Sequence, residues 1–117
     1  IRAAILSYQH SERLKSELII TSQLIGEVAG TDAGEVRGAT RIVSSFLAAV
    51  LSETRIAYNV LSSKILLEAD RKMVECIRNV ELADYAQAIH LVAEAISIVT
   101  TIANDALQFL IDQGLMR

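Results

Sequence analysis

The sequence predicts an all-α protein, an antiparallel bundle of long helices. Three observations lead to this fold class. Proline is absent from the 117 residues, and only five residues are aromatic. The apolar residues are mostly Ala, Leu and Ile, which favours helices over strands. Long stretches repeat apolar residues at spacings of three and four. Because this length suits one hydrophobic core, we expect residues 1–117 to form a single domain.

The first helix is expected over residues 2–29. Gly30 can end it in a left-handed conformation, and Asp32 with Glu35 has the spacing of a capping box that starts the next helix. The apolar stripe that defines this first helix consists of Leu14, Leu18, Thr21, Ile25 and Val28.

The second helix is expected over residues 33–78, because apolar or small residues continue at helical spacing from Val36 to Ile77. A helix of that length would measure about 69 Å, far more than its neighbours. Polar segments near residues 52–55 and 59–64 are the candidate breaks. The sequence therefore predicts three long helices, or four if the second one breaks between residues 52 and 64.

The last helix is expected over residues 84–113, with Asp84 and Gln87 as a second capping-box pair. Its apolar residues cover more than one side of the helix, which is wider than one small bundle needs. On this argument an outer flank would face water in a monomer, and a second chain would cover it. That flank comprises Leu91, Ala95, Ile98 and Ile102. On the second helix, Ile65, Leu66, Met73 and Ile77 would be exposed as well. We therefore expect at least a homodimer.

Composition bounds the function classes. The net charge is −3, with eleven Lys and Arg residues spread along the chain, so a nucleic-acid partner is not expected. The longest apolar stretch, residues 88–103, contains polar residues and a glutamate, so no membrane span is expected. A single cysteine, Cys76, agrees with a cytoplasmic location and is interpreted as a core residue. The chain begins at Ile1, which suggests a piece of a longer protein.

One polar strip on the last helix is the candidate binding site. His90 and Glu94 are four residues apart, a spacing that places both side chains on one helical face. Two ligands do not make a metal site, and no glutamate has histidine three residues later, so no metal, cofactor or catalytic residue is predicted. The whole strip is His90, Glu94, Ser97, Thr101 and Asn104.

These observations favour a non-enzymatic helical interaction or assembly module, which self-associates and docks a larger complex. Two alternatives stay open. One is an accessory helical subunit of a nucleoprotein complex, which salt-dependent binding to nucleic acid would reveal. The other is a bundle that binds a small molecule, which a polar-lined cavity would reveal.

Overall fold

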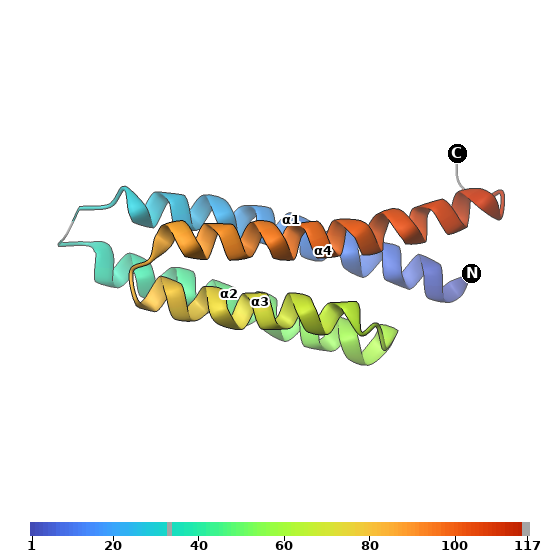
Figure 1. The fold of residues 1–117 in the computed structure, drawn as a ribbon, viewed down its shortest axis with the longest axis horizontal. Helices are drawn as coiled ribbons and strands as arrows, with labels where there is room; N and C mark the ends of the chain where they lie inside the picture. The colour runs from blue at the N-terminus through green and yellow to red at the C-terminus, as the bar shows by residue number, and fades with distance from the viewer. Residues whose placement is uncertain (33, 116–117) are drawn as a thin grey trace.

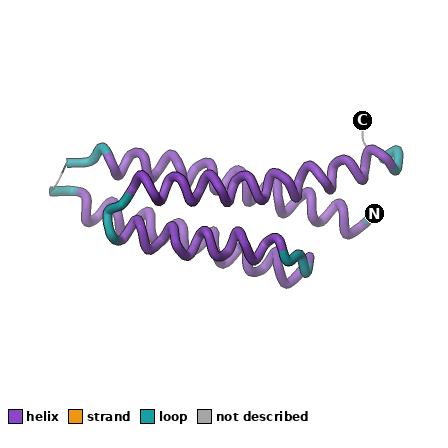
Figure 2. The backbone as a smooth tube through the Cα atoms, viewed as in Figure 1, coloured by secondary structure: helices purple, strands orange, loops and turns teal. Residues whose placement is uncertain are grey.

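The computed structural model describes residues 1–32 and 34–115, which form four helices and no strand (Figure 1). The helices are α1 (Arg2–Ala29), α2 (Val36–Leu61), α3 (Ile65–Glu81) and α4 (Tyr85–Asp112). Consecutive helices run in opposite directions and are joined by short connections, as Figure 2 shows. Each helix packs against two others: α1 against α2 and α4, and α3 against α2 and α4. The all-helical prediction is confirmed for the described residues.

Helix α1 has the bounds that the sequence predicts, and its buried residues Leu14, Leu18, Ile25 and Val28 belong to the predicted stripe. Gly30 follows α1 with φ of −95°, so the left-handed conformation expected there is wrong. The expected capping box at the start of the next helix is also wrong. Helix α2 begins at Val36 with Glu35 as its N-cap, and no side chain caps it. Instead, the backbone carbonyl of Asp32 accepts hydrogen bonds from the amides of Glu35 and Val36, at 2.9 and 3.1 Å.

The continuous helix expected over residues 33–78 is not present. Helix α2 ends at Leu61, and Ser62 takes a left-handed conformation with φ of 53°. The Ser62 amide donates to the carbonyl of Tyr58 at 2.7 Å, which closes the last turn. The chain then reverses within the second polar segment and continues as α3. Neither glycine nor proline marks this reversal, which is why the sequence indicated residues 59–64 only as one of two candidate breaks, with four helices as the alternative.

Reversal of the chain buries residues that a straight helix would have exposed. Of the four α3 residues expected to be exposed, Leu66 and Met73 are buried and Ile77 is partly buried, because α3 folds back against α2 and α4. Ile65, at the start of α3, is 48% exposed, as expected. On α4, Leu91, Ala95 and Ile102 are buried as well, and Ile98 is partly buried. The wide apolar arc of α4 is therefore explained largely within one chain, and the width argument for a dimer is wrong.

Helix α4 differs from the expected range of 84–113 by one residue at each end. The Asp84 carboxylate accepts a hydrogen bond from the Gln87 amide at 3.2 Å, so the predicted N-cap is present. This helix is long and apolar enough to cross a membrane by length and composition. It also contributes nine buried residues to the core, and a core helix has the same composition. The sequence-based expectation of no membrane span stays a prediction.

Candidate functional site

The predicted polar strip lies on the outer face of α4. His90 Nε2 and Glu94 Oε1 are 3.1 Å apart, and Glu94 Oε2 also contacts Lys72 Nζ of α3 at 3.0 Å. The structure thus adds a lysine from the neighbouring helix, which sequence spacing within α4 could not reveal. The result is a chain of three polar side chains, His90, Glu94 and Lys72, at the surface, where ion pairs contribute little to stability.

The remaining residues of the strip lie at the surface of α4. Ser97, Thr101 and Asn104 are exposed, and the Thr101 hydroxyl donates to the Ser97 carbonyl at 3.0 Å. A hollow at each end of the molecule is described below, and none of these three side chains lines either of them. Within residues 1–32 and 34–115, no group of three His, Cys, Asp or Glu side chains is arranged to hold a metal ion.

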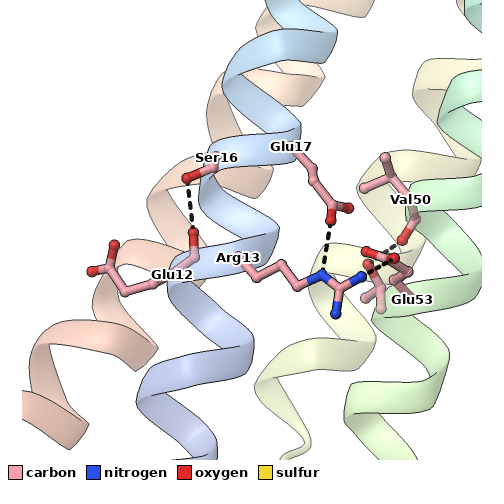
Figure 3. Close-up of polar contacts among 7 residues, drawn as sticks. Glu12, Arg13, Ser16, Glu17, Val50 and Glu53 are labelled. Carbon is pink, nitrogen blue, oxygen red and sulfur yellow. Dashed lines mark hydrogen bonds and ion pairs between the residues drawn. The ribbon is translucent and has the colours of Figure 1, made fainter.

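A second cluster of charged residues joins α1 to α2 (Figure 3). Arg13 of α1 donates from Nε to Glu17 Oε1 at 3.2 Å and from Nη2 to Glu53 Oε1 of α2 at 2.9 Å. The pKa of Glu17 is raised to about 7, chiefly by burial and also by the nearby carboxyl of Glu53, while Arg13 acts in the opposite direction. The cluster therefore holds a proton near neutral pH.

A carboxyl group with such a pKa is suited to acid–base chemistry, but this one lacks room for a substrate. The hollow beside it measures about 150 Å³ and is lined by His10, Arg13 and Glu53, together with Leu14 and Ile56. Ligand sites are usually about 300–1,000 Å³. We therefore interpret the cluster as a polar link between two helices. Sequence spacing missed Glu53 because 40 residues separate it from Arg13.

Cys76 is fully buried in the core, in agreement with the sequence-based interpretation. Its thiol donates to the Ala88 carbonyl at 3.4 Å, and burial raises its pKa to about 12. Because the thiolate is the reactive form, a buried thiol of this kind is inert near neutral pH.

Ion pairs occupy much of the most basic region of the chain, along α2 and α3. Arg55 contacts Asp70 at 2.8 Å, Arg71 contacts Glu68, and Lys72 contacts Glu94 as described above. Acidic side chains thus neutralise much of the positive charge there. A phosphate backbone would have to displace these pairs, which argues against a nucleic-acid surface at this place.

A hollow of about 700 Å³ lies where α1 begins and α4 ends. Helix α4 is eleven residues longer than α3, a difference of about 16 Å of helix. Figure 1 shows the start of α1 and the end of α4 extending together past the α2–α3 turn. At this open end only two helices lie side by side, and the two others stop short. We call this hollow the open-end groove.

The open-end groove has an apolar lining that is incompletely covered. Val60 and Ile65, which flank the α2–α3 turn, line it and are 51% and 48% exposed. Phe109 of α4 is 44% exposed and follows the lining residue Asp105 by one helical turn. Two charged side chains, Arg2 and Asp105, line the same groove. The sequence could not locate it, since its position depends on where the chain reverses between α2 and α3.

Comparison of the chain with protein-family models, with curated proteins and with solved structures finds no match. The inference of function therefore depends on the surfaces described above.

Proposed function

We propose that this chain is a non-enzymatic helical assembly module that pairs with a second copy of itself through the open-end groove. One observation carries the proposal. The α1–α4 pair continues past the α2–α3 turn and leaves apolar side chains about half exposed where two further helices would complete a bundle. A contiguous apolar surface of this kind is typical of an interaction site.

A second copy is the occupant that fits this end best. In a two-fold arrangement each copy would supply the two helices that the other lacks, so the combined end would again have four. Charge favours the same partner. Because Arg2 and Asp105 both line the groove, each copy offers one positive and one negative group that can pair with the opposite group of the other.

The expected affinity is modest. Burying the exposed half of a side chain such as Val60, Ile65 or Phe109 contributes about 1 kcal/mol. Six such side chains in two copies would contribute about 6 kcal/mol, which is similar in size to the entropic cost of association, so dimerisation also depends on the Arg2–Asp105 pairs and the rest of the lining. We therefore expect a concentration-dependent dimer, with the groove acting as a weak contact that further partners could reinforce.

Light scattering coupled to size exclusion tests the proposal. At concentrations from about ten micromolar to the millimolar range, the mass of the wild-type chain is expected to rise from 12.8 kDa toward twice that value. The variant Ile65→Glu places a charge in the groove and should remain monomeric.

Ile20→Glu is the matched control. Ile20 lies in the middle of α1 and is 46% exposed, close to the 48% of Ile65, so the two variants differ mainly in location. The control should dimerise like the wild type. A wild-type chain that stays monomeric throughout would overturn the proposal, and so would dimerisation lost in Ile20→Glu but kept in Ile65→Glu.

A further inference from the structure

A second hollow lies at the other end of the molecule, between the first half of α2 and the α3–α4 turn. It measures about 610 Å³, within the range of small-molecule sites. Arg37 and Arg41 line it from α2, one helical turn apart, and Tyr85 lines it from α4. Within residues 1–32 and 34–115 neither arginine takes part in an ion pair. Two guanidinium groups without acidic partners thus border one cavity in a chain whose net charge is −3.

Hydroxyl groups surround the two arginines. Thr40 and Tyr85 line the hollow and hydrogen-bond to each other across it, with 3.3 Å between Oγ1 and the phenol oxygen. Ser44 and Ser45 also line it. The Ser44 hydroxyl oxygen is buried and lacks a hydrogen-bond partner in the described structure. A buried hydroxyl without a partner is unfavourable, and a rotation of this side chain toward the hollow would let it donate to a ligand.

We propose that this hollow binds a small molecule that carries a phosphate group. Arginine forks donate paired hydrogen bonds to phosphate oxygens, and the surrounding hydroxyls can donate to the remaining oxygens. Val36, Val80 and Ala83 supply an apolar wall, which suits an organic group attached to the phosphate. Glu81 is the acidic residue in the lining, and it disfavours an anion. This proposal is independent of dimerisation, because the helix ends that line the open-end groove and those that line this hollow lie at opposite ends of the bundle, as the ribbon in Figure 1 shows.

Phenyl phosphate and inorganic phosphate are the probes, titrated into the full chain and followed by backbone amide chemical shifts in NMR. Phenyl phosphate is expected to bind more tightly than inorganic phosphate, because only the ester can use the apolar wall. The shifted amides should belong to the start of α2 and to the α3–α4 turn. No saturable shift there with either probe would overturn the proposal.

Charge-matched variants separate the site from the overall electrostatics. Arg37→Gln combined with Arg41→Gln should weaken phenyl phosphate binding by about tenfold or more. Arg71→Gln combined with Arg78→Gln removes the same charge from exposed positions on α3 and should bind phenyl phosphate like the wild type. Equal weakening in both double variants would mean that the chain attracts anions only through its total charge, which would contradict the proposed site.

Two single variants test the details of the lining. Glu81→Gln should bind phenyl phosphate more tightly, because the opposing charge is removed. Ser44→Ala should bind it less tightly without loss of thermal stability, because it removes a hydroxyl that has no partner in the folded chain. If Ser44→Ala raises stability and leaves binding unchanged, Ser44 is not part of the site. If Glu81→Gln leaves the affinity unchanged, the anion does not occupy this hollow.

Discussion

At two turns of the described structure, a residue other than glycine has a left-handed backbone conformation, with a positive φ. Ser62 between α2 and α3 has φ of 53°, and Ala83 between α3 and α4 has φ of 61°. For a residue with a side chain this conformation costs about 1–2 kcal/mol, because the Cβ atom approaches the following carbonyl oxygen. The packing that each turn permits therefore has to outweigh local strain.

Relief of this strain gives the first prediction. Ala83→Gly should stabilise the protein by about 1 kcal/mol, since glycine adopts a positive φ without steric cost. Ala93→Gly is the control, because Ala93 is exposed in the middle of α4, where glycine costs about 1 kcal/mol. Thermal unfolding should thus shift in opposite directions for the same substitution. A lower melting temperature for Ala83→Gly would mean that strain at this turn is negligible.

The proton held by Glu17 makes stability depend on pH. Its pKa is about 7 in the folded chain and 4.5 as the ordinary value. Between these values the unfolded chain has released a proton that the folded chain keeps, so the free energy of unfolding decreases as pH rises from 4.5 to 7. The contribution of this proton to the free energy of unfolding is fully present below pH 4.5 and is lost above pH 7.

Glu17→Gln should remove this dependence. We expect the variant to be more stable than the wild type at pH 8, by on the order of 1–2 kcal/mol after allowance for partial solvent exposure, and to lose little stability between pH 5 and 8. Urea unfolding at several pH values measures it. Glu27→Gln, at an exposed position of α1, controls for the loss of one carboxylate. If the stability of the wild type and of Glu17→Gln changes with pH in the same way, protonation of Glu17 does not contribute to the pH dependence of folding.

At the scale of single helices, α4 is the element whose environment is most fully defined. Its fully buried side includes Val92, Ala95 and Val99, each at most 1% exposed. Ile96 of the same helix is only partly buried. Both α1 and α3 pack against α4.

Charge substitutions along α4 should follow this burial. Val99→Asp places a carboxylate without a partner in the core, and we expect a loss of more than about 3 kcal/mol in the free energy of unfolding. Ile96→Asp should cost less, because the carboxylate can reach water. Glu94→Gln should cost under about 1 kcal/mol, since it removes only surface ion pairs to His90 and Lys72. Urea unfolding followed by circular dichroism ranks the three, and any other order would contradict the orientation of α4.

At the scale of the whole molecule, the unequal helix lengths determine the shape. The molecule measures 55 × 26 × 18 Å, and the short α3 leaves one end with two helices in place of four. The proposed dimer follows from this geometry and not from the width of the apolar arc on α4.

Self-association at this end should couple to stability. If two folded copies bind each other, the melting temperature rises with protein concentration, because association removes folded monomer from the unfolding equilibrium. We expect this rise for the wild type across a hundredfold range of concentration, about ten micromolar to one millimolar, and not for Phe109→Glu. Differential scanning calorimetry measures it. A melting temperature independent of concentration in the wild type would contradict self-association through the open end.

The sequence by itself determined the fold class and the outer helices. Periodic apolar residues and the absence of proline were enough to predict α1 without error and α4 to within one residue at each end. Their ends are marked by local signals, Gly30 and the Asp84 cap, and both signals depend on neighbouring residues alone. Burial of Cys76 followed from the same periodicity.

Tertiary structure alone decided where the chain reverses between α2 and α3, and with it both candidate surfaces. The polar residues around Ser62 are compatible with a helix and with a turn, so their intrinsic helix propensity does not decide between the two structures. Burial of Leu66, Met73 and their neighbours against α2 and α4 is available only after reversal, and it outweighs the left-handed strain at Ser62. The open-end groove, the Arg37–Arg41 hollow and the Glu17–Glu53 pair all join residues distant in sequence. No spacing rule connects such residues, because their distance is set by packing.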